Sequence, residues 1–312
     1  MDHISRRNFL KTATLTGAVL GLSGTFPRWV KGVLAQPPLP PDLAVVKGAP
    51  EAAVRKAVEL LGGIGKFVKS GDKVVIKPNA SFANTPDWGS TTTPEVLTAV
   101  AKLCLEAGAK RILVMDNPLR ASESCREKTG LGKACEALGP KVSFLLIDKE
   151  RYFSEVPVPN GKTLQKVAIA RELLTPNVLI NLPVAKSHSA AGVAFGMKNL
   201  MGLVWDRGYF HEHADLHQAI AELSTVIKPR LVILDATRAL MTGGPGGPGK
   251  TKQLDTIVAG TDPVAVDSYA TGLAPWYDKT FTGRQVKYIL AASQLGLGQV
   301  DLDKLRIAKI NA

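Results

Sequence analysis

The sequence predicts an α/β domain: a mostly parallel sheet with helices on both faces, forming a single large domain. Three observations support this prediction. Apolar runs of strand length alternate with segments of helical periodicity. Several of the runs are nearly continuous Val, Ile and Leu, as in parallel strands that are buried on both faces. The length of 312 residues suits one domain with a full hydrophobic core.

The predicted domain follows a proline-rich stretch. Four prolines lie between Pro37 and Pro41, and they favour an extended linker over residues 36–42. The α/β domain is expected over residues 43–312. Apolar runs predict strands at Leu43–Lys47, Lys73–Lys77, Arg111–Asp116, Val142–Ile147, Val178–Leu182, Leu231–Asp235, Thr256–Ala259 and Leu305–Ile310.

Helical segments are expected between these strands. The second has clear start chemistry, because Thr93 can cap the helix, Pro94 suits its first turn and Glu95 complements its dipole. The segment Tyr152–Thr163, which contains an Asn-Gly pair, is expected to leave the sheet as a hairpin. Periodicity predicts helices at Glu51–Val68, Pro94–Ala107, Leu131–Leu138, Ala190–Val204, Leu216–Ile227, Pro263–Thr271 and Gln285–Leu295.

The N-terminus carries an export motif. The segment Ser5–Lys11 matches the twin-arginine signal, with Arg6 and Arg7 as its signal residues. The apolar stretch that follows, Thr12–Phe26, is shorter than the roughly 20 residues that a membrane-spanning helix needs. We therefore expect a removable signal peptide over residues 1–35, export by the twin-arginine machinery to the periplasm, and no transmembrane segment after cleavage. The alternative is an uncleaved anchor.

Charge and cysteine content limit the classes of partner. The formal net charge of +12 favours anions, and the chain has no dense arginine stretch that would indicate nucleic acid, so small anionic molecules are the expected ligands. Cys104, Cys125 and Cys135 are odd in number and lack the C-x-x-C spacing of zinc or iron–sulfur sites. They are interpreted as buried or incidental thiols, the alternative being a Cys125–Cys135 disulfide formed after export.

Polar residues follow the apolar runs at the point where each predicted strand ends. The carboxyl ends of parallel strands share one edge of a sheet, where ligands bind. Two lysines, an imidazole and carboxylates would meet there and could hold an anion, a metal or both, although turns and helix caps use the same residue types. Asp262 before Pro263 is interpreted as such a structural cap. The residues at the predicted edge are Lys77, Asn79, Asp116, Lys186, His188, Asp235 and Asp262.

A histidine cluster follows the fourth predicted helix. His213 and His217 are four residues apart and would share a helix face, which is a spacing that can bind one divalent metal. His188 or an aspartate at a strand end could complete such a site. Ala214 occupies the place of the general-base Glu in H-E-x-x-H, so zinc-peptidase chemistry is not expected. Histidines that contact substrate, or that are simply exposed, are the alternatives.

The segment Gly244–Thr251 matches the P-loop pattern literally, but we do not expect a nucleotide P-loop. Pro245 and Pro248 remove backbone N–H donors on which such a loop depends, and a strand, not a helix, is expected to follow. The functional alternative is a mobile active-site flap in which Lys250 contacts an anionic group. The other is a plain surface loop.

Lys198 and Asn199 are the polar residues of an otherwise apolar segment, Gly192–Leu203. A buried lysine needs a polar cavity or a carboxylate partner, so Lys198 is a candidate site residue. The alternative is a lysine whose stem covers apolar surface while its ammonium reaches solvent.

In order and spacing, five motifs resemble an uncharacterised family known as domain of unknown function 362. They are Val75–Asn79, Thr92–Glu95, Asn181–His188, Met197–Gly202 and Ala259–Asp267. The resemblance extends from about Leu43 to Ile310. The cysteine-rich, ferredoxin-like segment of some members does not occur here, so no built-in iron–sulfur cluster is expected. The pocket residues that the resemblance implies are Lys77, Asn79, Lys186, His188, Lys198, Asn199, His217, Asp235, Asp262 and Asp267.

Two functional hypotheses follow. In the first, the protein is an exported enzyme whose lysines bind a carboxylate or phosphate. The catalytic candidates of this enzyme are Lys186, His188 and Lys198, with His188 as general acid or base. His217 with Asp235 or Asp267 would hold a metal. Its substrate-binding candidates are Lys77, Asn79, Asn199 and Lys250. In the second, a periplasmic binding protein captures an anionic solute in the same pocket without chemistry. Twin-arginine export favours the enzyme.

Overall fold

The computed structural model describes residues 39–175 and 178–312. The signal peptide expected over residues 1–35, with Arg6 and Arg7, lies outside these residues, as do residues 36–38 of the linker expected over 36–42. Within the described residues, no helix has the length and hydropathy that crossing a membrane requires.

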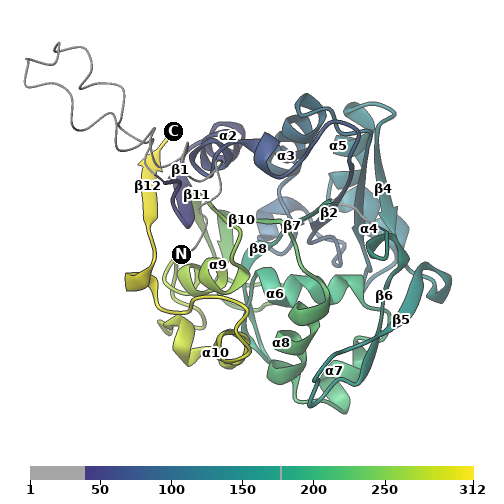
Figure 1. Cartoon of the computed structure of the whole chain (residues 1–312), viewed down its shortest axis with the longest axis vertical. Helices are drawn as coiled ribbons and strands as arrows, with labels where there is room; N and C mark the ends of the chain where they lie inside the picture. Colours follow the sequence, from purple (N-terminus) through teal and green to yellow (C-terminus); the bar gives the residue numbers. More distant parts are fainter. Residues whose placement is uncertain (1–38, 176–177) are drawn as a thin grey trace, which may run out of the picture. The chain divides into compact units, whose positions relative to one another are not determined.

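A mixed, mostly parallel sheet forms the centre of the domain (Figure 1). Its strands follow the order β12-β1-β11-β10-β7-β2-β3-β4. Strand β11 is antiparallel to both its neighbours, and the other pairings along this path are parallel. The strands are β1 (Leu43–Lys47), β2 (Lys73–Pro78), β3 (Arg111–Asp116), β4 (Val142–Leu146), β7 (Val178–Leu182), β10 (Leu231–Leu240), β11 (Thr251–Gly260) and β12 (Ile307–Asn311).

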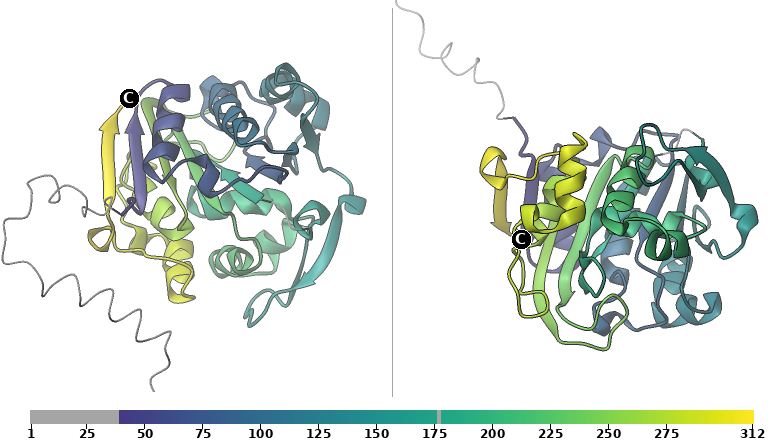
Figure 2. Two further views of the ribbon diagram at one scale, coloured as in Figure 1. Left: turned by 45° about the horizontal axis from the view of Figure 1, so that its top comes forward. Right: turned by 90° about the horizontal axis from the view of Figure 1, so that it is seen from below.

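Helices cover both faces of this sheet, which confirms the predicted fold class (Figures 1 and 2). One face carries α2 (Pro50–Leu60), α3 (Pro94–Glu106), α4 (Ser122–Lys128) and α5 (Leu131–Ala137). The other carries α6 (Gly196–Asn199), α7 (Gly208–Glu212), α8 (Leu216–Val226), α9 (Pro263–Ala270) and α10 (Lys287–Gln294).

The strand pattern explains why the sheet has two cores. In β2, Val75 packs into one core, while Val74 and Ile76 pack into the other. Successive side chains of a strand point to opposite faces, so a continuous run of apolar residues supplies both faces with core residues.

The helix predicted over Ala190–Val204 is wrong. This region forms β9 (Gly192–Ala194), the short helix α6 and a 3-10 turn over Leu200–Leu203. Gly192 has a φ of +79°, which suits a turn and not a helix. The preceding strand β8 (Val184–His188), which sequence periodicity did not reveal, pairs with β9 and β10.

Other differences concern lengths and small elements. The helix predicted over Glu51–Val68 ends at Leu60, because Gly62 and Gly63 adopt positive φ values that end it. The predicted hairpin exists but is longer, pairing β5 (Phe153–Pro157) with β6 (Lys166–Ala170). The three cysteines are buried free thiols.

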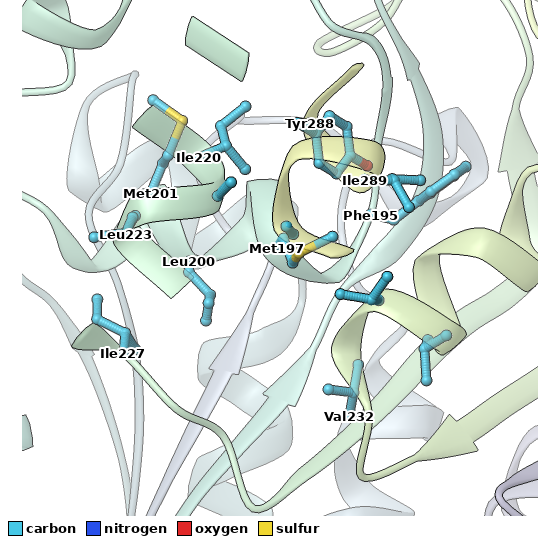
Figure 3. Packing of buried hydrophobic residues seen from close by; sticks show 14 of the residues in the cluster. Phe195, Met197, Leu200, Met201, Ile220, Leu223, Ile227, Val232, Tyr288 and Ile289 are labelled. Carbon is cyan, nitrogen blue, oxygen red and sulfur yellow. The ribbon is translucent and has the colours of Figure 1, made fainter. Parts of the chain in front are cut away.

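Apolar packing holds α6 and the turn after it in place (Figure 3). Met197 and Leu200 belong to the core that includes Ile220 of α8 and Ile289 of α10. The backbone N–H groups of Gly196 and Met197 also donate to the buried Asp267 carboxylate, at 2.7 and 3.0 Å. This short segment is therefore rigidly attached, and it carries Lys198 and Asn199.

Candidate functional site

A cavity of about 280 Å³ lies at the carboxyl ends of β2 and β8. Predicted site residues at the end of β2 meet there with residues of β8 and α6, which lie more than one hundred residues later in the chain. The predicted residues that line it are Lys77, Asn79, Lys186, His188, Lys198 and Asn199; it is completed by Ser81, Phe82, Leu119, Ser189, Ala190, Ala194, Met201, Gly202, Arg207, His211 and Pro245.

Lys77 and Asp116 form a buried ion pair beneath this cavity. Their side chains are 1% and 0% exposed, and Lys77 Nζ lies 2.9 Å from Asp116 Oδ1. The other carboxylate oxygen accepts hydrogen bonds from Ala80 N and Ser81 Oγ. Burial lowers the pKa of Lys77, and Asp116 opposes this shift. The charge of Lys77 is thus largely committed to the protein.

The two predicted asparagines, Asn79 and Asn199, form hydrogen bonds within the protein. Asn79 Oδ1 accepts from Val184 N at 2.8 Å, which ties the end of β2 to the start of β8. Asn199 Oδ1 accepts from Lys77 Nζ at 2.8 Å, and its Nδ2 donates to Asn181 Oδ1. Their amides position the lysines of the site.

Lys186 has good partners for a charged ammonium. Its Nζ donates to Ser90 O at 2.7 Å and lies 5.2 Å from the centre of the Phe82 ring. Burial nevertheless lowers the pKa of Lys186 to about 7, with only partial compensation from Asp116. Small anions that reach this lysine would favour its protonated form.

Lys198 has a different environment, and its side chain is partly exposed. Its Nζ contacts Met201 Sδ at 3.1 Å, and a thioether is a weak acceptor. Burial, followed by the nearby charge of Arg207, lowers the pKa of Lys198 to about 7. Within residues 39–175 and 178–312, no carboxylate forms an ion pair with Lys186 or Lys198.

Two residues of the cavity, Arg207 and His211, were not among the site residues predicted from the sequence, although His211 belongs to the predicted histidine cluster. Arg207 donates to Pro118 O at 3.1 Å and lies in the cavity wall. His211 stacks on His188, with ring centres 6.0 Å apart and planes 6° apart. Arg207 is the N-cap of α7, four residues before His211, so their spacing places them on one side of this turn.

His188 is held in one tautomer. Its Nδ1 accepts from the backbone N–H groups of Ala190 and Ala191, at 3.1 and 3.2 Å. The proton of the neutral ring therefore resides on Nε2. Burial and then the nearby Lys198 charge lower the pKa of His188 to about 2. In this geometry the neutral ring of His188 can donate a hydrogen bond through Nε2.

The four residues expected to bind a metal are not brought together. Asp235 accepts from Thr93 N and Thr237 N, and Asp267 holds the start of α6. His213 is exposed, and His217 lies in the first turn of α8. In the part of the chain that the structure describes, no group of three or more His, Cys, Asp or Glu side chains could hold a metal ion. The carboxylates of Asp235 and Asp267 instead accept hydrogen bonds from backbone N–H groups.

Lys250 also lies away from the cavity. It is exposed and lies 3.7 Å from Asp278, whereas Pro245 of the same loop lines the cavity. Gly244 O accepts from Ser189 N and from the Tyr277 hydroxyl, so the loop is anchored beside the site. The segment joins two antiparallel strands, β10 and β11, and no helix follows it.

The cap predicted at Asp262 is confirmed. It is the N-cap of α9, its side chain accepts from Ala265 N, and Pro263 follows in the first turn. Its second oxygen accepts from Gln299 N at 2.7 Å, which also ties the C-terminal segment to this helix.

The family described as domain of unknown function (DUF362) matches residues 74–272. This chain belongs to the DUF362 family. All the residues that line the cavity lie within the matched range. The chain is also similar to the "Thylakoid-associated protein sll1697" of Synechocystis sp., with 31% identity over 230 residues, which cover 71% of this chain and 69% of that protein.

A solved structure with a related arrangement is the lactate racemase apoprotein from Thermoanaerobacterium thermosaccharolyticum. The match has a TM-score of 0.44 and 12% sequence identity. It covers 70% of this chain, which spans 56% of that protein.

Proposed function

We propose that this DUF362 protein is an enzyme that acts on a small molecule bearing a carboxylate or a phosphate. The observation that carries the proposal is the cavity shared by Lys186, Lys198 and Arg207, none of which pairs with a carboxylate among the described residues. Uncompensated buried cations are costly, and an anionic ligand would stabilise them. The cavity of about 280 Å³ suits a small ligand.

The lysines suggest more than capture of an anion. Two side chains with a pKa of about 7 can each exchange a proton near neutral pH. Lys186 and Arg207 would hold the anionic group, Lys198 would move a proton, and the Nε2–H of His188 would donate to an oxygen of the substrate. Binding without chemistry in the same cavity is the competing function.

Titration calorimetry with inorganic phosphate and with propionate tests the binding step. We expect affinity to be highest below about pH 7 and to fall as the pH rises through the lysine pKa, because only the ammonium attracts an anion. Binding should take up protons at neutral pH. The Lys186→Met variant should bind both anions more weakly, while the exposed Lys252→Met variant serves as control. Unchanged affinity in Lys186→Met would refute this assignment.

Turnover separates the enzyme from the binding protein. A panel of small carboxylates and phosphates is incubated with the wild type and with Lys198→Met, and product formation is followed by NMR. Conversion by the wild type that is lost in Lys198→Met supports the enzyme. Tight binding without conversion of any member would favour the solute-binding function.

We also infer that the protein reaches the periplasm by the twin-arginine route. The support is the segment Ser5–Lys11, with its paired arginines. Replacing Arg6 and Arg7 together by lysine should retain the protein in the cytoplasmic fraction, with the full precursor mass. Export of this double variant at the wild-type level would contradict the inference.

A further inference from the structure

Of the three lysines that line the cavity, Lys186 and Lys198 have no carboxylate partner among the described residues, and they differ in what their nitrogen atoms contact. Lys186 Nζ donates to a carbonyl oxygen and lies over an aromatic ring, and both partners favour a positive charge. Lys198 Nζ contacts only a thioether sulfur in the described structure, with Arg207 nearby. An ammonium has three N–H donors to satisfy, whereas a neutral amine needs fewer acceptors. This difference favours a free amine at Lys198.

Lys198 is also the accessible lysine of the site. Its side chain is partly exposed, while those of Lys77 and Lys186 are 1% and 3% exposed. Core packing of Met197 and Leu200 (Figure 3) and the hydrogen bonds to Asp267 fix the backbone of α6. Lys198 of this helix lines the cavity. A neutral, positioned and accessible amine beside another cation is the arrangement of a nucleophilic lysine.

We propose that Lys198 forms a Schiff base with the carbonyl carbon of a substrate that also carries a carboxylate, as a 2-oxo acid does. This inference rests on the proposed function, since the carboxylate would be held by Lys186 and Arg207. The Nε2–H of His188 would donate to the carbonyl oxygen. Phe82, Leu119 and Met201 supply apolar wall for the rest of the substrate.

The reaction balances without a further cofactor. The lone pair of Lys198 Nζ forms the C–N bond, and the carbonyl π electrons move to oxygen, which takes a proton. After proton transfer from nitrogen to solvent, the oxygen takes a second proton and leaves as water, while the nitrogen lone pair forms C=N⁺. The net change is amine plus carbonyl plus one proton, giving iminium plus water. The ammonium of Lys186 or solvent supplies the proton.

Borohydride trapping with pyruvate as the probe tests the proposal. The folded wild-type protein is incubated with pyruvate and sodium borohydride, digested, and mapped by mass spectrometry. We expect a reduced, stable secondary amine at Lys198 in excess of any adduct at exposed lysines such as Lys252. Propionate, which lacks the carbonyl, should compete with pyruvate and prevent the adduct.

Variants separate the two lysines. Lys198→Met should lose the adduct and keep measurable anion binding, whereas Lys186→Met should keep Lys198 as the modified residue but require more pyruvate. The mapping in the wild type does not depend on whether either variant folds. An adduct located at Lys186, or at exposed lysines alone, would overturn the assignment.

Calorimetry with pyruvate and propionate distinguishes this inference from the proposed function. If both anions bind but borohydride traps nothing at Lys198, the Schiff base is refuted and anion binding stands. If neither of these anions nor inorganic phosphate binds to the wild type, the proposed function fails and this inference fails with it.

Discussion

Lys77 and Asp116 place two opposite charges where water does not reach them. Replacing Asp116 by Asn would leave the lysine charge uncompensated while retaining an oxygen acceptor for Ala80 N. Breaking one partner of a buried pair costs about 3–5 kcal/mol of unfolding free energy. We expect Asp116→Asn to lose stability of this order, measured by chemical denaturation.

The control for that prediction removes both charges. The double variant Lys77→Met, Asp116→Asn retains the amide acceptor and eliminates the isolated cation, so it should be clearly more stable than Asp116→Asn alone. If the single and double variants are equally unstable, the loss comes from the hydrogen bonds of Asp116 and not from the charge.

Most residues of the site could be predicted from the sequence, because the polar side chains that form it follow the ends of parallel strands. Lys77 ends a continuous apolar run, so its place at the sheet edge could be predicted. Lys186 and His188 were identified as site residues although the strand that carries them was not. Arg207 lies in a segment without clear periodicity, and nothing local marks its approach to the site. His211 begins the histidine cluster of residues 211–217, of which His213 and His217 were the predicted site residues. The tautomer of His188 depends on two backbone amides, which only the folded chain supplies.

Among the elements, the hairpin of β5 and β6 supports the segment that carries Arg207. Ala168 O of β6 accepts from Trp205 N at 3.0 Å, two residues before Arg207. The turn of the hairpin is fixed by the buried Glu222 of α8, whose oxygens accept from the backbone N–H groups of residues 162, 163 and 164. One carboxylate therefore connects α8 to the hairpin.

Glu222→Ala should release this hairpin. Three amides lose their acceptor, and an unsatisfied buried group costs about 1–3 kcal/mol. Burial raises the pKa of Glu222, but the backbone hydrogen bonds outweigh it and lower the pKa overall. The stabilisation is therefore present above the unfolded pKa and lost as the pH falls through the folded one. Hydrogen exchange should accelerate at residues 162–164; unchanged protection there would contradict the role.

Gly202, in the 3-10 turn after α6, occupies a position with no room for a side chain. A Cβ at this position would lie 2.1 Å from Asp116 Oδ1 and 2.7 Å from Lys77 Nζ. We expect Gly202→Ala to separate this ion pair and to destabilise the fold by several kcal/mol, on the order of a broken buried pair. Gly192→Ala is not a steric control, because its φ is positive. Gly272→Ala is, because a Cβ there would make only an ordinary contact, 3.7 Å from Tyr269 O. Equal melting temperatures for the Gly202 and Gly272 variants would refute the prediction.

Close contacts at glycine also explain why the elements of residues 190–204 were predicted wrongly. Residues 190–204 are apolar and small, which resembles a buried helix in periodicity. Gly196 and Gly202 instead allow Asp267, Lys77 and Asp116 to approach the backbone closely. These are long-range contacts, and a helical pattern cannot reveal them. By contrast, α3 and α9 have proline and acidic start signals, which predicted their first residues.

For the whole molecule, continuous Val, Ile and Leu runs predicted a parallel sheet correctly, because both faces of such strands are buried. The antiparallel position of β11 was not predictable in the same way. It depends on a long hairpin with β10, in which the predicted flap forms the turn. Each strand can thus be predicted from its own apolar run, whereas the order and direction in which the strands pair cannot.

Burying Lys186 and Lys198 in the cavity lowers the unfolding free energy of the whole domain at neutral pH. Between about pH 7 and the ordinary lysine pKa of about 10.4, an unfolded lysine is protonated, while Lys186 and Lys198, with pKa values lowered to about 7, are mostly neutral in the fold. The unfolded state then binds more protons, so unfolding free energy rises with pH, by about 1.4 kcal/mol per pH unit for each lysine. Above about pH 9 the buried Cys104 and Cys135, with pKa values raised to about 12, oppose this rise.

We therefore expect unfolding free energy, measured by chemical denaturation without added anions, to increase from pH 7 to pH 9. Lys186→Met and Lys198→Met should each reduce this slope and raise stability at pH 7 by on the order of a few kcal/mol, since an apolar side chain replaces a poorly compensated cation. Phosphate should stabilise the wild type at pH 7 more than either variant. A flat pH profile in the wild type, or variants that lose stability with an unchanged slope, would show that the cavity bears no such electrostatic cost.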